Sequence, residues 1–401
     1  MKRLHVAFIG EVDHGKSTLI GRLLLDTGSL TLSRRQAVES GAITLAHVVD
    51  QLGREQDQSM TVTSTEVVLR GAPKPVVLVD APGHEQFLRH MLSGTSVAHA
   101  ALLLLDATEG VKEETTRHAF LAKLLQIEQA AAVVNKLDCV PDPQAAFKRA
   151  VAALDGLQRT VGFALRAVVP ASAQTGANVV KPGFSWWEGP TVLSVILGFE
   201  SPDPAQGPVR FSVQDKYDFL PEQAVVGRVE RGVLRRGAAL LVLPGEEIVR
   251  VEALLDFPPK TIESLAAGFS GALLLDRPEA VRPGVVLVDP AGAPEPVTCF
   301  QGRIFCLGPR PIRTGCSYLL RCSTQEVEAH VEECRERLDS GTLRPLGPAD
   351  VVEPLQVATL RIRTAKPVVV EPPSSSPALG RFVLQEETDI EACGMVVGVE
   401  P

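Results

Sequence analysis

The first half of the chain alternates short apolar runs with longer amphipathic segments. Five runs are almost continuously apolar and end in polar or glycine residues, at 4–10, 75–83, 100–107, 130–138 and 166–173. Such runs are typical of parallel strands buried on both faces. The segments between them, at 17–26, 85–96, 115–125 and 143–157, have helical spacing. The alternation predicts a doubly wound α/β domain, with ligands at the carboxyl ends of a mostly parallel sheet.

The pattern changes after the Pro- and Gly-rich segment 201–208, which reads as a linker. The later apolar runs are short and rich in β-branched residues, at 225–232, 238–244, 248–255, 271–276 and 285–290. Turns containing Gly or Pro separate them, which favours a small β-barrel. A second break falls at 290–296, and short strands follow it to the end of the sequence.

Composition and charge narrow the function classes. The 401 residues are 45% hydrophobic and 22% charged, with a net charge of −8, which disfavours nucleic acid as the main partner without excluding a local basic patch. The seven cysteines form no CxxC pair, so reduced thiols in a cytosolic protein are favoured over a zinc site. Neither a signal peptide nor a membrane span is expected, so we predict a cytoplasmic protein.

The first strand is followed by a glycine-rich segment that opens a helix. It reads Gly10-Glu11-Val12-Asp13-His14-Gly15-Lys16-Ser17-Thr18. The glycines let backbone N–H groups approach phosphate oxygens, and the helix adds its positive N-terminal dipole. Lys16 is expected to reach the β- and γ-phosphates and Ser17 to ligate Mg²⁺. The segment predicts a nucleotide site that includes Gly10, Val12, Asp13, His14, Gly15, Lys16, Ser17 and Thr18.

A second motif, Asp80-Ala81-Pro82-Gly83-His84, follows the second strong strand. A carboxylate at a strand end opposite the phosphate loop suits a magnesium contact, so Asp80 is a candidate metal residue. Gly83 leaves its N–H free to approach the γ-phosphate. His84 is then placed near the attacking water and is the candidate catalytic residue.

Two further motifs are expected to recognise the base of the nucleotide. Asn135-Lys136-Leu137-Asp138 closes another strand, and the Asp138 carboxylate can accept from N1–H and the N2 amine of guanine. Adenine offers no such donor pair, so the motif selects GTP over ATP. Asn135 is expected to brace the loop and Lys136 to lie over the ring. Ser172 and Ala173 end the last strand and are expected to present a backbone N–H to guanine O6.

The four motifs in this order resemble the translation-factor class of GTPases, which includes elongation factors Tu and 1-alpha. Segments 20–30, 52–65, 87–111, 186–196 and 208–219 are more similar to the large, GTP-binding subunit of sulfate adenylyltransferase. The resemblance covers essentially the whole chain. It implies a GTP-binding domain over 1–200, a β-barrel over 209–291 and a second β-barrel over 296–401.

The resemblance also implies roles in the first switch. Thr61 is expected to ligate Mg²⁺ through its hydroxyl when GTP is bound, and Val12 and Met60 to form a gate beside His84. The family pattern is Gly-Ile-Thr, whereas this chain has Ser59-Met60-Thr61. Loss of glycine restricts the backbone, and Met is more flexible than Ile. We therefore expect this difference from the family pattern to affect closure of the first switch.

The leading functional expectation is a GTPase subunit of sulfate adenylyltransferase. By family resemblance, such a subunit couples GTP hydrolysis to formation of adenosine 5′-phosphosulfate from ATP and sulfate by a separate, smaller catalytic subunit, its partner in a hetero-oligomer. The first alternative is an elongation-factor-like GTPase that binds tRNA, which requires a basic surface. The second is a regulatory GTP-binding module.

Overall fold

The computed structural model describes residues 4–57, 65–80, 98–201, 206–219, 222–256 and 260–400. The chain divides into two compact units. The N-terminal unit comprises Met1–Pro202 with Ser340–Leu343, and the barrel unit comprises Asp203–Asp339 with Arg344–Pro401. Within the described residues, no helix is both long and apolar enough to cross a membrane.

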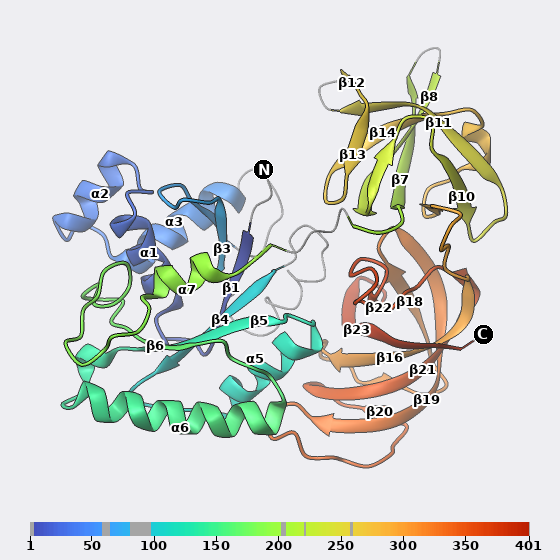
Figure 1. Ribbon diagram of the computed structural model, residues 1–401. Helices are drawn as coiled ribbons and strands as arrows, with labels where there is room; N and C mark the ends of the chain where they lie inside the picture. The colour runs from blue at the N-terminus through green and yellow to red at the C-terminus, as the bar shows by residue number, and fades with distance from the viewer. Residues whose placement is uncertain are drawn as a thin grey trace. The chain divides into compact units, whose positions relative to one another are not determined.

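A six-stranded sheet forms the centre of the N-terminal unit (Figure 1). Its strands, in spatial order, are β2 (Thr65–Leu69), β3 (Val76–Asp80), β1 (Leu4–Ile9), β4 (Ala100–Asp106), β5 (Gln129–Asn135) and β6 (Val168–Pro170). All neighbouring pairs are parallel except β2–β3 at one edge. Every residue of β3, β4 and β5 is buried, as expected for strands covered on both faces.

Helices cover both faces of this sheet, with α1, α3 and α7 on one side and α5 and α6 on the other (Figure 1). The helices are α1 (Lys16–Asp26), α2 (Leu32–Glu39), α3 (Leu45–Asp57), α5 (Glu113–Leu124), α6 (Pro143–Val161) and α7 (Val192–Gly198), with a 3₁₀ turn η1 (Leu137–Cys139). Local chemistry sets their ends. In α6, Pro143 occupies the first turn, the Asp142 side chain accepts from Ala145 N at 2.9 Å, and Gly162 ends the helix at φ 66°.

The barrel unit contains two closed sheets. In the first, the pairing of β10 with β11 closes a ring made of β10 (Ala239–Leu243), β15 (Val286–Val288), β7 (Arg210–Phe219), β8 (Glu222–Arg231), β14 (Ser270–Leu275) and β11 (Ile248–Asp256). Shorter strands β9 (Val233–Arg235), β12 (Lys260–Ile262) and β13 (Ser264–Ala266) and a 3₁₀ turn η2 (Pro278–Ala280) complete it. The second is a barrel of β16 (Val297–Cys306), β21 (Gln356–Val368), β19 (Gln325–Asp339), β18 (Ser317–Cys322), β22 (Arg381–Glu386) and β23 (Asp389–Glu400), with β17 (Ile312–Arg313) paired to β20 (Val351–Val352).

The two barrels pack together through apolar and charged contacts. Leu243, Val286 and Val288 of the first barrel form one buried cluster with Val369 and Leu379 of the second. Beside this cluster, Arg210 from the first barrel forms a buried ion pair with Glu371 from the second. The two barrels therefore share one interface core within a single compact unit.

The predicted fold class is confirmed: an α/β domain with a mostly parallel sheet precedes two β-barrels. Several element bounds were wrong. The strand predicted over 130–138 ends at Asn135, because Lys136 adopts a left-handed φ of 60° and starts η1. Helices α2 and α3 and strand β2 were not predicted; α2 buries no residue, so it carries no apolar stripe. The helix predicted over 85–96 lies outside the described residues.

Candidate functional site

The phosphate loop joins β1 to α1, and glycine is required at two of its positions. Gly10 has φ 141°, and a Cβ there would lie 2.6 Å from the Leu104 carbonyl oxygen. Gly15, immediately before α1, has φ 89°, and its Cβ would lie 2.5 Å from Asn135 Nδ2. Both steric contact and backbone conformation therefore exclude larger side chains, and the loop backbone lies directly against β4 and β5.

The remaining loop residues fall into buried and exposed groups. His14 is buried, whereas Val12 is 72% exposed and Asp13, also exposed, adopts a left-handed φ of 68°. Thr18 is half-buried in the first turn of α1. The structure thus places Val12 and Asp13 at the surface of the loop, where a ligand can reach them, and His14 beneath it.

Lys16 holds its ammonium group inside the loop. Its Nζ donates to the carbonyl oxygens of Gly10 and Glu11 at 2.7 and 2.8 Å. Burial lowers the pKa of this amine, although the nearby carboxylates of Asp80, Asp13 and Glu11 oppose the shift. The ammonium is therefore desolvated and within reach of the region enclosed by the loop, which is the arrangement that favours a charge-assisted bond to a phosphate oxygen.

Ser17 and Asp80 meet at the end of β3. The Ser17 hydroxyl donates to Asp80 Oδ2 at 2.8 Å, and Asp80 Oδ1 is buried with no hydrogen-bond partner among the described residues. Burial raises the pKa of Asp80, against the opposing effects of Ser17 and Lys16. A buried carboxylate oxygen without a partner beside a hydroxyl is a hard, oxygen-only donor set, and it fits Mg²⁺.

Asn135 links the phosphate loop to the loop after β6. Its Nδ2 donates to the His14 carbonyl oxygen at 2.9 Å, and its Oδ1 accepts from Ala173 N, also at 2.9 Å. Asn135 is 1% exposed. Two segments separated by well over a hundred residues in the sequence are therefore held by the two ends of one buried amide.

The other residues of the base motif lie on the turn after β5. Lys136 is half-buried, and its Nζ forms an ion pair with Asp106 Oδ2 at 2.8 Å; Asp106 also accepts from Thr108. Asp138 is exposed in η1. Sequence analysis missed Asp106, although it ends a buried strand in the same way as Asp80.

The loop at Ser172 and Ala173 is fixed by the protein itself. Ser172 N donates to the Ala177 carbonyl at 3.1 Å, and Ala173 N donates to Asn135. From α1, Arg22 Nε donates to the Ala173 carbonyl at 3.1 Å. Both backbone N–H groups expected to contact guanine O6 thus have protein acceptors in this structure. A contact with O6 would therefore require one of these N–H groups to be shared between two acceptors.

Comparison with known proteins identifies the family. A model of the elongation factor Tu GTP-binding domain matches residues 1–236, and a model described as GTP-eEF1A C-terminal domain-like matches residues 299–397. The first match alone spans more than half of the 401 residues. The chain belongs to the family of elongation factors Tu and 1-alpha. It is a GTP-binding protein of the translational GTPase type.

Relatives within this family match over nearly their full length. Elongation factor 1-alpha of Pyrococcus abyssi is 32% identical over 421 residues, covering 99% of this chain and 98% of the relative. That of Methanopyrus kandleri is 32% identical over 427 residues, covering 100% and 98%. A solved structure of sup35 complexed with GDP covers 100% of this chain at 24% identity, with a TM-score of 0.47. Both of these relatives are elongation factors 1-alpha. They agree with the first alternative, an elongation-factor-like GTPase, and not with the leading expectation of a sulfate adenylyltransferase subunit.

Three predicted site residues, Thr61, Gly83 and His84, lie outside the described residues. The structure brings the described ones to the carboxyl ends of β1, β3, β5 and β6, at one edge of the sheet. It also adds charged residues around the phosphate loop that sequence analysis did not single out. The Glu109 carboxylate contacts the His14 ring, and Lys112 contacts both Glu109 and Glu11.

Proposed function

We propose that this protein is an elongation-factor-like GTPase that binds GTP with Mg²⁺, hydrolyses it and changes its affinity for a partner in doing so. The observation that carries the proposal is the buried bridge made by Asn135 between the phosphate loop and the loop at Ala173. It joins a phosphate-binding element to a base-binding element in a chain of the elongation factor family.

In this proposal each described residue has one task. Lys16 binds the β- and γ-phosphates, and Ser17 and Asp80 hold the cation. When bound, Mg²⁺ supplies positive charge beside the phosphate oxygens. Asp138 accepts from the guanine ring, and Lys136, oriented by Asp106, covers it.

Base recognition can be tested by Asp138→Asn. The amide donates to the extra carbonyl of xanthine, so we expect GTP affinity to fall and affinity for xanthosine triphosphate to rise. Calorimetric titration with both nucleotides measures the exchange. Unchanged GTP affinity without a gain for the xanthosine nucleotide would remove Asp138 from the site.

Hydrolysis can be tested by His84→Ala. In this proposal His84 orients the attacking water, so its loss acts on the transition state and lowers the single-turnover rate about 10²–10⁴-fold while GTP affinity changes little. His47→Ala, on exposed surface, is the matched control. A wild-type rate in the His84→Ala protein would exclude the catalytic role.

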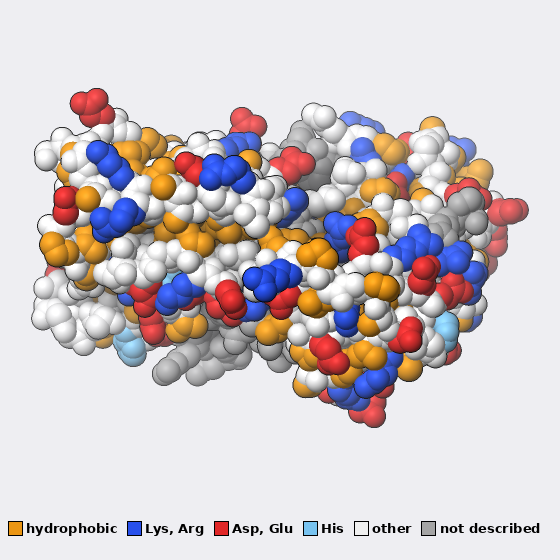
Figure 2. Space-filling model, turned by 90° about the horizontal axis from the view of Figure 1, so that it is seen from below, with side chains coloured by type: hydrophobic (Ala, Val, Ile, Leu, Met, Phe, Trp, Pro, Cys, Tyr) orange, Lys and Arg blue, Asp and Glu red, His pale blue; other side chains and the backbone are white. Residues whose placement is uncertain are grey.

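The proposed partner is aminoacyl-tRNA, which is supported by the full-length similarity to elongation factor 1-alpha. On the face drawn in Figure 2, Lys and Arg side chains lie among Asp and Glu side chains. Among the residues coloured there, they do not gather into one patch of a single sign. Binding on such a surface depends on specific contacts more than on bulk attraction to phosphates.

A second candidate is the GTPase subunit of sulfate adenylyltransferase, favoured by the sequence of segments 52–65, 186–196 and 208–219. One experiment separates the two. With GTP, the elongation-factor function predicts protection of the aminoacyl ester of tRNA against spontaneous hydrolysis. The sulfate function predicts no protection, and GTP-dependent release of pyrophosphate from ATP and sulfate by the complex purified from its source cells. The Lys16→Met protein, deficient in nucleotide binding, is the control for both arms.

A further inference from the structure

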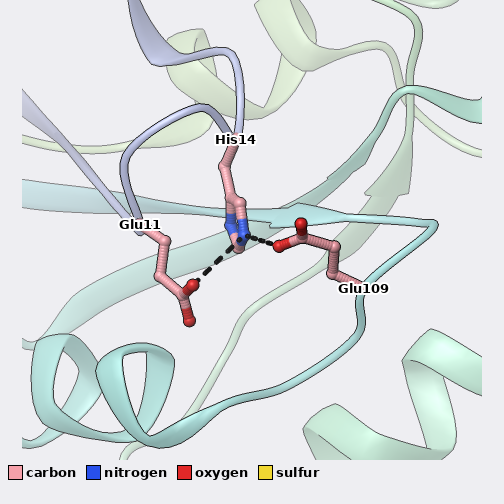
Figure 3. Close-up of side chains that lie close together, drawn as sticks. All are labelled: Glu11, His14 and Glu109. Atoms are coloured by element: carbon pink, nitrogen blue, oxygen red, sulfur yellow. Dashed lines mark hydrogen bonds and ion pairs between the residues drawn. The ribbon is translucent and has the colours of Figure 1, made fainter.

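A histidine and two glutamates meet beneath the phosphate loop (Figure 3). Glu11 and His14 belong to the loop itself, and Glu109 belongs to the segment between β4 and α5. His14 Nε2 lies 3.3 Å from Glu109 Oε2 and 3.7 Å from Glu11 Oε2. One ligand atom from each residue lies within 4.8 Å of the others. The cluster shares no residue with the proposed Mg²⁺ site at Ser17 and Asp80.

The His14 ring faces oxygen acceptors on both sides. Nδ1 lies 3.1 Å from the Leu104 carbonyl oxygen, and Nε2 faces the two carboxylates. A neutral imidazole carries one N–H and therefore satisfies only one of these sides. Donation from Nδ1 to the carbonyl turns the Nε2 lone pair toward negative oxygens. A metal ion on Nε2 would satisfy both sides of the ring at once.

We propose that Glu11, His14 and Glu109 bind a divalent transition metal ion, with Zn²⁺ as the probe. Imidazole nitrogen and carboxylate oxygen are both ligand types that zinc binds, and three protein ligands leave a fourth position for water. Zinc bonds of about 2.0–2.2 Å in a tetrahedron place neighbouring ligand atoms about 3.3–3.6 Å apart. The distances of 3.3 and 3.7 Å from Nε2 to the two carboxylate oxygens are close to that spacing.

Two of the three ligands are already oriented by outer-shell partners. The Leu104 carbonyl fixes the His14 ring, and the Thr115 hydroxyl donates to Glu11 Oε1 at 3.2 Å, leaving Glu11 Oε2 toward His14. His14 and Thr115 are buried. Histidine ligands in metal sites generally have such a partner on the other ring nitrogen, and outer-shell partners raise metal affinity by holding the ligands in place.

Lys112 is the competing cation. Its Nζ contacts Glu109 Oε2 at 2.6 Å and lies 3.6 Å from Glu11 Oε2, the same two oxygens that face His14. The Lys112 side chain is 47% exposed, so solvent screens this pair and the ammonium can move away at small cost. A divalent ion would replace it between the two carboxylates. The bound metal would then fix the phosphate loop to the segment before α5.

The test measures Zn²⁺ binding by calorimetry on the full-length protein in excess Mg²⁺, which occupies the nucleotide site. We expect one Zn²⁺ site in the wild type whose affinity falls at least about 10–100-fold in Glu109→Gln, because the loss of an outer-shell partner alone already has that effect. Lys112→Met removes the competing ammonium and should raise the affinity. Glu113→Gln, exposed at the start of α5, is the matched control and should behave as the wild type.

The opposite effects of two neighbouring substitutions make the result specific. Zinc bound by exposed thiols such as Cys139 or Cys316 would be unaffected by either change, so equal binding in wild type and Glu109→Gln would overturn the proposal. Absence of binding in both the wild type and Lys112→Met would also overturn it. Thermal denaturation of each variant confirms that Glu109→Gln remains folded.

Discussion

Both units bury charged side chains, but these side chains have different kinds of partner in the two units. In the barrel unit, Arg210 is 2% exposed and meets both oxygens of Glu371 at 2.8 and 3.0 Å, while its other N–H groups donate to the carbonyls of Val209 and Gly292. In the N-terminal unit, and among the residues that the structure describes, Lys16 donates only to backbone carbonyls and Asp80 keeps a buried oxygen without a hydrogen-bond partner.

The difference separates charges that are paired within the protein from charges that have no side-chain ion pair among the described residues. Arg210 and Glu371 neutralise one another, so their interaction is complete within the protein. Burial lowers the pKa of Lys16 and raises that of Asp80, which means that the site disfavours the charged form of each. A phosphate and a cation would reverse both effects. We therefore expect a bound phosphate and cation to stabilise this part of the N-terminal unit.

The largest expected effect is on the barrel interface. Glu371→Gln leaves the Arg210 guanidinium buried without a counter-charge, and we expect the free energy of unfolding to fall by about 3–5 kcal/mol. Urea denaturation measures this change. Glu326→Gln, in an exposed pair with Arg321, should cost less than about 1 kcal/mol. Equal, small losses in both variants would mean that the buried pair does not hold the barrels together.

Lys16→Met should weaken GTP binding without destabilising the protein, in contrast to Glu371→Gln. GTP affinity is expected to fall about 10²–10³-fold through loss of charge-assisted bonds to phosphate, measured by calorimetric titration. The nucleotide-free protein should be as stable as the wild type or more stable in thermal denaturation, since a desolvated ammonium is removed. Lys148→Met, exposed on α6, is the control. A large loss of stability in Lys16→Met would place this lysine with Arg210 as a structural charge.

His99 lies directly before β4, at the amino ends of the parallel strands. We expect it to make the stability of the N-terminal unit depend on pH. Burial, with a smaller effect from His5, lowers the pKa of His99 to about 4. The unfolded chain takes up this proton near pH 6.5 and the folded chain only near 4, so stability present above pH 6.5 is lost as the pH falls toward 4. The loss is up to about 3 kcal/mol.

His99→Asn should remove this part of the acid sensitivity, because an amide oxygen can replace Nδ1 as acceptor for His5 N at 3.2 Å. Urea denaturation at pH 7 and pH 4.5 gives the comparison, with exposed His47→Asn as control. If the wild type and His99→Asn lose the same free energy on acidification, His99 is not the group responsible.

The smallest expected effect is that of Ser17→Ala. Removing one hydroxyl ligand should raise the Mg²⁺ concentration needed for half-maximal GTP binding about 10-fold, the equivalent of one hydrogen bond to a charged group. Ser17→Thr keeps the hydroxyl and serves as control. Identical magnesium dependence in Ser17→Ala and the wild type would exclude Ser17 as a ligand of the cation.

Local sequence was sufficient for the α/β domain because its strands are buried on both faces. Continuous apolar runs such as β4 and β5 have few other interpretations, and the motifs mark the strand ends where the candidate site lies. Helix α2 was missed because none of its residues is buried, so no hydrophobic period marks it. The edge strand β2 was missed because five residues give too short an alternation to identify.

The site was predictable as a set of motifs but not as a set of contacts. The glycines at 10 and 15 were expected because they let backbone N–H groups approach phosphate oxygens, whereas the structure shows that neighbouring atoms of Leu104 and Asn135 also exclude a side chain. The links from His14 to Glu109 and from Lys136 to Asp106 join residues that are far apart in the sequence. No spacing rule reports such pairs, because they arise only when parallel strands place their ends side by side.

The amide of Asn135 has a consequence for how fragments of a nucleotide bind. Because one side chain holds both the phosphate loop and the Ala173 loop, ordering either loop also orders the other. The protein's own contacts already fix this bracket, since Ser172 N and Arg22 also hold the Ala173 loop. A ligand that contacts either loop is therefore spared the entropic cost of ordering it. This holds for an intact nucleotide and equally for a fragment that contacts only one of the two loops.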